Sequence, residues 1–400
     1  MKRQREFGTS GESLTPLMVA AHDANFKITE ALLEAGADVN HLKEGGLSAL
    51  CFAANAGAYE VTKLLLEAGA SVNQPCKSGW TPLLAATNAM NYRVVELLLD
   101  HGAALYHQKE DGGTALILSS FQGQLELTDL FLTRGAEVNQ ADSEGITPLY
   151  VAVQENRVEV ADLLLRRGAR TEVRRVDGAT ALYLATQVGN TGMARLLLEA
   201  RADVDQTCYN GWTALMIAVQ EGFEATAEAL LDGGADVDAV TDDDESALMI
   251  AALNGRLSMV KLLLRHGSSL DQIDAFGETA FSVASGEVLN ALHEADLSRL
   301  YARSGFTEIF QQEVEDGGFF APLEQWGPVL TPTARASLRA WAATRADDAQ
   351  TCFAALHQGQ AAGGPLQRLR DCDDLRRVLM RYLVYASPGT RAGLRALQGL

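Results

Sequence analysis

Several features that define other protein classes are missing from this sequence of 400 residues. No apolar run approaches the ~20 residues that a membrane-spanning helix requires, so we expect no membrane insertion. The five cysteines are an odd number and include no Cys-x-x-Cys pair, which argues against a disulfide framework and against a zinc site. The basic residues 1–6 are followed by no apolar segment, so we expect no secretory signal.

Motifs of catalysis and of ligand binding are missing as well. The sequence has no Gly-x-x-x-x-Gly-Lys-Ser/Thr loop, no Gly-x-Ser-x-Gly elbow and no His-Glu-x-x-His helix. Its seven histidines never fall at i, i+4 spacing. The acidic run at residues 242–245 lacks the central Gly and the closing Glu of a calcium loop, and we interpret it as solvated. We therefore expect no enzymatic activity, no metal and no cofactor.

Negative charge is concentrated in the first three quarters of the chain. The net charge is −19; residues 298–400 hold twelve Arg, no Lys and ten acidic residues, a net charge of +2, which leaves −21 for residues 1–297. Nucleic acids and anionic lipids bind through clustered Lys and Arg, so neither is an expected partner. A basic peptide or a basic protein surface would be attracted to this region.

A hydroxyl residue followed by Pro or Ala returns every 33 residues between positions 15 and 279. Ser and Thr cap helix N-termini, and Pro is tolerated at the first helical position because its missing N–H would be unpaired there. The spacing predicts nine helical units, which start near Thr15, Ser48, Thr81, Thr114, Thr147, Thr180, Thr213, Ser246 and Thr279.

Each unit repeats a second set of signals. A small residue, Ala or Ser, stands five positions after the opening residue, where two helices must approach closely. An apolar triplet such as residues 64–66 predicts a second helix. This helix is expected to end where a left-handed residue follows, and Arg201 occupies that place in the sixth unit with some strain. Gly occupies it elsewhere, at Gly36, Gly69, Gly102, Gly135, Gly168, Gly234 and Gly267.

The Thr-Pro-Leu-x-x-Ala core, the Gly-Ala-Asp-Val-Asn close and the 33-residue period together resemble the ankyrin repeat, over about three quarters of the chain. The family's usual His after Thr-Pro-Leu, which hydrogen-bonds within the turn, is absent. Its loss predicts a more apolar and less rigid hairpin. The residues in its place are Met18, Cys51, Leu84, Ile117, Tyr150, Tyr183, Met216, Met249 and Ser282.

The resemblance implies an all-α solenoid in which each repeat contributes a helix-turn-helix and a hairpin-like finger. We expect an N-terminal segment at 1–14, the ankyrin repeat solenoid at 15–297 with a shortened ninth unit, and a helical C-terminal domain at 298–400. Apolar residues at i, i+3, i+4 and i+7 from Leu375 to Tyr382 support helix in the last segment. Asn40, Asn73 and Asn139 match the place at which asparaginyl hydroxylases modify ankyrin proteins, and a turn role also explains them.

Large or charged residues at finger and inner-helix positions are the candidates for partner binding, because the repeat itself leaves these positions free. Trp80 and Trp212 each stand just before a capping Thr, and Tyr209 lies beside Trp212. Exposed aromatics are typical of interface hot spots, although each Trp could instead cover the neighbouring finger. The predicted partner-binding residues are Trp80, Phe121, Arg174, Arg175, Tyr209, Trp212 and Phe276.

Cys76 and Cys208 hold the same place in equivalent fingers, four repeats apart. The helix spacing puts them roughly 40 Å from each other. A disulfide needs Cα atoms within about 7 Å, so these two cannot pair within one chain. Cys51 falls in a helix that we expect to be buried, and we interpret it as a core residue.

These observations predict a non-enzymatic scaffold, a cytoplasmic monomer that binds a basic protein or an extended peptide in the ankyrin groove. The short basic cluster near the N-terminus leaves a nuclear location open. The alternative is an adaptor whose domain at 298–400 recruits an effector such as a ubiquitin ligase. A suppressor-of-cytokine-signalling box, which recruits a ubiquitin ligase, often follows ankyrin arrays. Pro365 could open such a box, but Arg370 stands where the box has Cys.

Overall fold

The structure is a computed structural model that describes residues 14–43 and 45–302. The chain divides into two compact units, and the boundary follows Ala235. The N-terminal segment up to residue 13 lies outside the described residues. Residues 303–400, which make up most of the predicted helical domain, also lie outside the described residues. The adaptor alternative depends on this part of the chain.

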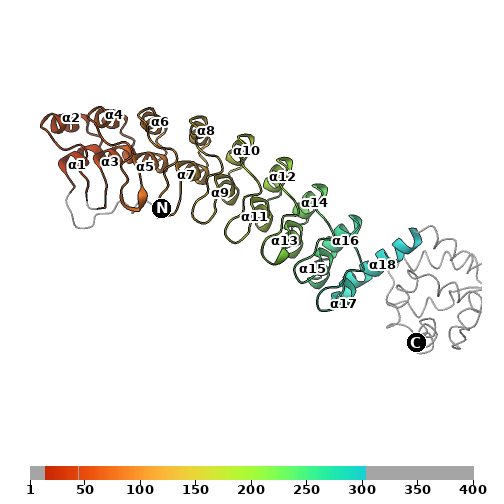
Figure 1. The fold of residues 1–400 in the computed structure, drawn as a ribbon. Coiled ribbons are helices and arrows are strands. Elements are labelled where there is room, and N and C mark those ends of the chain that lie inside the picture. The colour runs from red at the N-terminus through yellow and green to blue at the C-terminus, as the bar shows by residue number, and fades with distance from the viewer. Residues whose placement is uncertain (1–13, 44, 303–400) are drawn as a thin grey trace, which may run out of the picture. The chain divides into compact units, whose positions relative to one another are not determined.

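In the described part of the first unit, short helices begin directly after the predicted capping residues (Figure 1). Each capping oxygen accepts a hydrogen bond from the backbone N–H three residues later, as Thr15 Oγ1 does from Met18 N at 3.2 Å. The predicted helix starts are therefore confirmed. These first helices are α1 (Pro16–His22), α3 (Ala49–Ala56), α5 (Pro82–Asn88), α7 (Ala115–Gln122), α9 (Pro148–Gln154), α11 (Ala181–Gln187) and α13 (Ala214–Glu221).

A second helix follows each first helix and packs on it. The predicted glycines lie one residue beyond the C-caps, with φ between 83° and 92°. Arg201 takes the same left-handed conformation at φ 62°, as the sequence predicted. The second helices are α2 (Phe26–Glu34), α4 (Tyr59–Glu67), α6 (Tyr92–Asp100), α8 (Leu125–Thr133), α10 (Val158–Arg166), α12 (Thr191–Glu199) and α14 (Glu224–Asp232).

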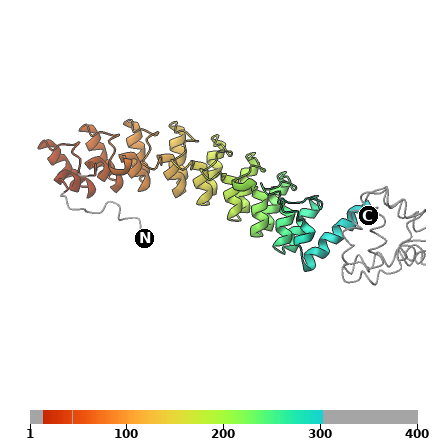
Figure 2. The same cartoon turned by 60° about the horizontal axis from the view of Figure 1, so that its bottom comes forward.

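The first helices pack against one another in chain order, from α1 against α3 to α11 against α13. Figures 1 and 2 show the pairs of this unit standing side by side, with the fingers between them. The small residue is buried in every repeat of this unit, and it has no exposed surface at Ala53, Ala86 and Ser119, for example. Because a larger side chain would hold neighbouring helices apart, this position sets the close spacing of the stack.

The second unit continues the pattern and ends it. Helices α15 (Ala247–Leu253) and α16 (Leu257–Arg265) form one more pair. The ninth opening residue, Thr279, caps α17 (Ala280–Val283), which has only four residues. The chain then passes through extended backbone at Ala284 into α18 (Gly286–Ala302), which packs against α16 and α17. The last repeat is thus shortened, as predicted.

Within residues 14–43 and 45–302 the secondary structure is helical apart from turns and one isolated antiparallel bridge between Val240 and Ser246. The predicted all-α fold of helix pairs is therefore confirmed. Two fingers contain a 3-10 turn, at Lys77–Gly79 and at Tyr209–Gly211, and these are the fingers that carry Trp80 and Trp212.

Candidate functional site: the finger surface

Each finger is a tight hairpin that closes next to the following first helix. Cys76 N donates a hydrogen bond to Trp80 O at 2.7 Å, and Cys208 N donates one to Trp212 O at 2.9 Å. The bond fixes the residue that precedes each capping Ser or Thr. The same bond starts at the backbone N of Lys43, Lys109, Asp142, Arg175, Thr241 and Asp274.

Neighbouring fingertips of the first unit are joined by backbone hydrogen bonds. Ser143 N donates to Asp111 O at 3.1 Å, and Val176 N donates to Glu144 O at 3.0 Å. Among the described residues of this unit, no equivalent bond joins Tyr209 to the finger of Asp177. The run of backbone links therefore stops at the finger that carries Tyr209.

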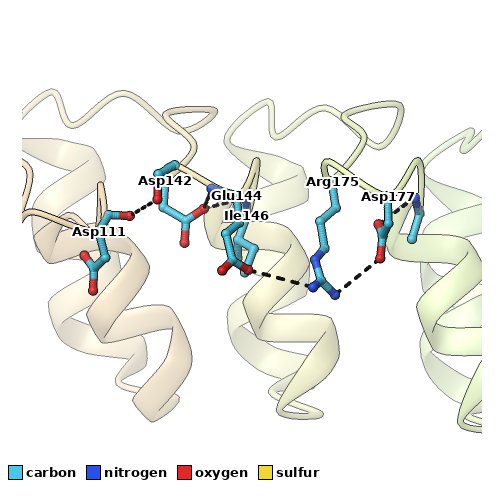
Figure 3. A network of polar contacts seen from close by, with 8 residues as sticks. Asp111, Asp142, Glu144, Ile146, Arg175 and Asp177 are labelled. Atoms are coloured by element: carbon cyan, nitrogen blue, oxygen red, sulfur yellow. Dashed lines mark hydrogen bonds and ion pairs between the residues drawn. The ribbon is translucent and has the colours of Figure 1, made fainter.

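Arg175 joins two neighbouring fingers of this unit (Figure 3). Its guanidinium lies 3.8 Å from the Glu144 carboxylate on the preceding finger and 3.5 Å from that of Asp177 on its own finger. Tyr150 on α9, Asp177 and Glu144 all raise the pKa of Arg175. In the preceding finger, Asp142 accepts from the backbone N–H groups of Glu144 and Ile146, both at 2.9 Å, which holds that tip in place. The charge of Arg175 is thus already partnered within the chain.

Trp80 is half-buried, and its ring faces the next finger. Lys109 Nζ lies 5.1 Å from the centre of the Trp80 ring and 2.7 Å from an Asp111 carboxylate oxygen. Partial burial raises the pKa of Asp111, but the hydrogen bonds from Lys109 and from the Gly113 amide outweigh it and leave that pKa below its usual value. The contacts of Trp80 are those of a residue that covers the neighbouring finger.

Tyr209 is in a different situation. Its side chain is 74% exposed at the tip of its finger, and Val176, at the equivalent tip position one repeat earlier, is also 74% exposed. Arg174 is exposed and donates a hydrogen bond from Nη1 to Thr207 O at 2.8 Å, which joins the two fingers. Trp212, half-buried, closes the hairpin of Tyr209. We call Arg174, Val176, Tyr209 and Trp212 the Tyr209 surface.

Sequence models of this architecture match most of the chain. The model described as ankyrin repeats (3 copies) matches residues 17–109, 103–175 and 168–241, and the model described as ankyrin repeats (many copies) matches residues 230–284. The chain belongs to the ankyrin-repeat family.

One solved structure similar to this ankyrin protein is the crystal structure of the human ASB11 ankyrin repeat domain. The two chains share 27% sequence identity and superimpose with a TM-score of 0.50. The similarity covers 56% of this chain and 99% of the ASB11 domain. Among curated proteins, no sequence matches the chain.

The position of the missing family His still connects helix and finger in this ankyrin protein. In several repeats, the residue that replaces the His interacts with the residue 25 positions later, which lies in the following finger. Tyr150 raises the pKa of Arg175 in this way, and burial together with Cys208 raises the pKa of Tyr183. In these repeats the residue in place of His therefore still influences a residue of the following finger.

The remaining predicted residues are not part of the Tyr209 surface. Phe121 is half-buried on α7, where its carbonyl accepts a hydrogen bond from Arg157 Nε at 3.2 Å. Phe276 is 79% exposed on a finger of the second unit. Val176 and Tyr106 were missed by the sequence analysis. When the repeats are aligned, Val176 falls at the same repeat position as Tyr209. This alignment is the sequence signal that could have identified Val176.

The asparagines at the end of the second-helix turns bridge consecutive repeats. Asn40 Nδ2 donates to Gly69 O at 3.1 Å, while its Oδ1 accepts from Ser71 N at 2.8 Å. Asn73 and Asn139 make the same pair of bonds one and three repeats later. These contacts explain the three residues as structural links between repeats.

The described residues offer little for other kinds of chemistry. They contain no group of three or more His, Cys, Asp or Glu side chains that could hold a metal ion. None of the helices in this part of the chain has the length and apolar character needed to cross a membrane. Exposed carboxylates do occur along neighbouring fingertips, at Glu110, Asp111, Glu144 and Asp177.

Proposed function

We propose that this ankyrin protein is a non-enzymatic scaffold that binds an extended, basic segment of a partner protein across its fingers, with the Tyr209 surface as the anchor. Ankyrin repeats mediate protein–protein interactions and are in general not catalytic, and the family assignment supports this part of the proposal. The proposals that the partner is basic and that it binds at the fingers are argued from the exposed residues of the fingers.

The observation that supports the anchor is the exposure of Tyr209 and Val176 on neighbouring fingertips. Burial of a Tyr ring and a Val side chain removes apolar surface from water, and Tyr is among the residues most enriched in binding hot spots. The missing backbone link between the fingers of Asp177 and Tyr209 leaves peptide groups at this point for hydrogen bonds to a partner. Trp212 closes the hairpin, because its carbonyl accepts the hydrogen bond from Cys208 N.

The observation that favours a basic partner is charge. Residues 1–297 carry a net charge of −21. Carboxylates are exposed on successive fingertips before Tyr209, and the two cations beside them are already paired, Lys109 with Asp111 and Arg175 with Glu144 and Asp177. A Lys- or Arg-containing segment that lies along the fingertips would meet this field without displacing a structural cation.

A display library of Lys/Arg-containing peptides, screened against the purified full chain, tests the proposal. The peptide that binds best is then measured against wild type and Tyr209→Ala. We expect the substitution to weaken binding about tenfold or more, as truncation of an aromatic hot spot does. Thermal unfolding should be unchanged, because the exposed ring makes few contacts in the unbound chain.

The chain offers a matched control. Tyr106 is 78% exposed in the turn that follows α6, outside the fingertips, and carries no partner-binding role in the proposal. Tyr106→Ala should leave the affinity within about twofold of wild type, as for residues outside a hot spot. Equal losses for both substitutions, or selection of acidic peptides by the library, would contradict the Tyr209 surface as a site for basic segments.

We also propose that the scaffold acts as a monomer, because its large net negative charge opposes contact between identical copies. Sedimentation equilibrium of the full chain at physiological salt measures this directly. A mass of twice the chain mass at micromolar concentration would exclude it.

A further inference from the structure

We propose that residues 1–13 of this chain cover the exposed end of its first repeat, with Phe7 seated against Val19, Ile28 and Leu32. We call Val19, Ile28 and Leu32 the end face. They lie on α1 and α2, the first helix pair of the stack (Figure 1). The end face is separate from the Tyr209 surface, and its occupant is a segment of the same chain.

The exposure of Ile28 shows that the first repeat carries an uncovered half of a repeat–repeat interface. The Ile28 side chain is 51% exposed, whereas the equivalent side chain of the following repeats is at most 3% exposed. The first repeat packs on its own second helix and on the next repeat as the others do. The difference therefore comes from the preceding repeat, which every later repeat has. The equivalents of Ile28 are Val61, Val94, Leu127, Val160 and Met193.

The other two residues of the end face differ from their equivalents in the same direction. Val19 is 42% exposed, and Phe52 one repeat later is 7% exposed. Leu32 is half-buried, and Leu65 in its place has no exposed surface. Thr29, by contrast, has no exposed surface, so the rest of α2 is packed as in later repeats. A terminal repeat with nothing to cover it normally has a polar outer face, and this one is apolar.

Asn25 leaves a polar group open at the edge of the end face. Its Oδ1 accepts a hydrogen bond from Ile28 N at 3.2 Å. Asn190 at the same repeat position makes this bond to Met193 N, and its Nδ2 also donates to Asn156 of the preceding repeat at 2.7 Å. No described residue accepts from Asn25 Nδ2, so this amide can donate to a carbonyl of a covering segment.

Residues 1–13 can reach the end face. Phe7, the one aromatic residue of this segment, stands seven positions before Leu14, where α1 is about to begin. Seven residues span at most about 25 Å. Helix α1 is about 10 Å long, and the axes of packed helices lie about 8–10 Å apart. Ile28, in the first turn of α2, therefore lies within reach of the Phe7 ring.

Charge favours this segment over a second copy of the chain. Residues 1–6 contain three cations and one carboxylate, and α2 exposes the carboxylates of Glu30 and Glu34. With Phe7 on the end face, the cations approach α2. Two copies that met at their end faces would each bring the net charge of −21 of residues 1–297. The burial of Phe7 and of the end face removes apolar surface from water on both sides of the contact.

A photo-cross-link in the full chain tests which segment covers the end face. p-Benzoylphenylalanine replaces Phe7, and an equal mixture of heavy-isotope-labelled and unlabelled chains is irradiated. Trypsin cuts after Arg5, Lys27 and Lys43, so position 7 lies on peptide 6–27, and Ile28 and Leu32 lie on peptide 28–43. Mass spectrometry is expected to find these two peptides joined, with both from the same chain. Joined peptides of mixed label would assign the face to a second copy and overturn the proposal.

Hydrogen exchange measures the contribution of the contact to local stability. We expect Phe7→Ala to speed amide exchange in α1 and α2 about tenfold, since the helices open more often without the buried ring, and to leave α11 and α12 unchanged. Thr9→Ala, in the same segment, is the matched control and should change neither region. Unchanged exchange in α1 and α2 of Phe7→Ala would overturn the proposal.

A pair of double variants identifies the surface that Phe7 contacts. Ile28→Gln should speed exchange in α1 and α2 as Phe7→Ala does, and the two changes together should have less than the sum of their separate effects on stability. Leu125→Gln, on α8 with a side chain that is 42% exposed, should add in full to Phe7→Ala because the two sites are remote. Full additivity of Phe7→Ala with Ile28→Gln would place Phe7 elsewhere.

Discussion

At the scale of single residues, the left-handed position after each second helix shows how a local conformation selects an amino acid. A Cβ built on Gly168 would meet no atom within 4 Å, so only the backbone conformation restricts this site. An L-residue in this region costs roughly 1–2 kcal/mol. Arg201 accepts that cost in the sixth repeat.

Replacing Arg201 by Gly and replacing Gly168 by Ala should therefore change the free energy of unfolding in opposite directions. We expect Arg201→Gly to stabilise the protein by about 1 kcal/mol, less a part lost to the greater freedom of Gly in the unfolded chain. Gly168→Ala should destabilise it by about 1–2 kcal/mol. Urea unfolding followed by circular dichroism measures both. A stabilising effect of Gly168→Ala would show that the conformation is not the restricting factor.

A second residue of interest is Glu245 in the second unit. Burial raises its pKa, and the nearby carboxylates of Asp274 and Asp243 raise it further. Because the pKa in the folded state lies above the unfolded value, ionisation of Glu245 opposes folding. This penalty is fully present above the folded-state pKa and disappears as the pH falls below the unfolded value.

Glu245→Gln is therefore expected to raise the unfolding temperature at pH 7. The gain should shrink as the pH falls and vanish at about pH 4, where wild type is protonated as well. Differential scanning calorimetry at both pH values tests this, with Asp242→Asn at an exposed neighbouring position as the control. The same gain at both pH values would rule out a charge effect.

At the scale of elements, the turn asparagines show what joins one repeat to the next. Asn73 Nδ2 donates to Gly102 O at 3.0 Å, and its Oδ1 accepts from Ala104 N at 2.8 Å. In the second unit the equivalent residue is Asp238, which accepts from Ser269 N at 2.6 Å. A carboxylate can accept but cannot donate, so Asp238 lacks one of the two bonds.

Substitution at the two places should again give opposite results. Asn73→Asp loses a donor and is expected to cost about 1 kcal/mol, whereas Asp238→Asn can donate to the Gly267 carbonyl and should gain up to a similar amount. Chemical denaturation reports both changes. A destabilised Asp238→Asn variant would indicate that the charge at this turn matters more than the missing donor.

The fingers mark the limit of prediction from the repeat pattern. Trp80 and Trp212 each precede a capping Thr, and in the sequence only the neighbouring residue, Lys77 or Tyr209, distinguishes them. In the structure the ring of Trp80 faces Lys109 of the next finger, while the finger of Trp212 presents an exposed Tyr209. The contact of the Trp80 ring depends on Lys109, which stands on the next finger, so this part of the difference follows from packing and not from the motif.

At the scale of the whole molecule, charge is the property most relevant to binding. The net charge of −19 sets up a field that acts on a basic partner before contact. Salt screens this field over about 8 Å at physiological ionic strength, so the effect belongs mainly to the encounter rate.

Association of the selected basic peptide should accordingly slow by about tenfold or more between 0.05 and 0.5 M NaCl, while dissociation changes less. Stopped-flow fluorescence separates the two rates. A peptide with Gln in place of Lys provides the control and should show little dependence on salt. An association rate independent of salt for the basic peptide would refute steering by the acidic fingers.

The sequence by itself determined the period, the capped helix starts, the left-handed glycines and the family. Each of these is a local rule that repeats every 33 residues, so one unit explains the others. Only the tertiary structure decided that Arg175 pairs with Glu144 and Asp177 and that the ring of Trp80 lies beside Lys109. These contacts join side chains of different elements, and the distance between such side chains is set by how the repeats stack.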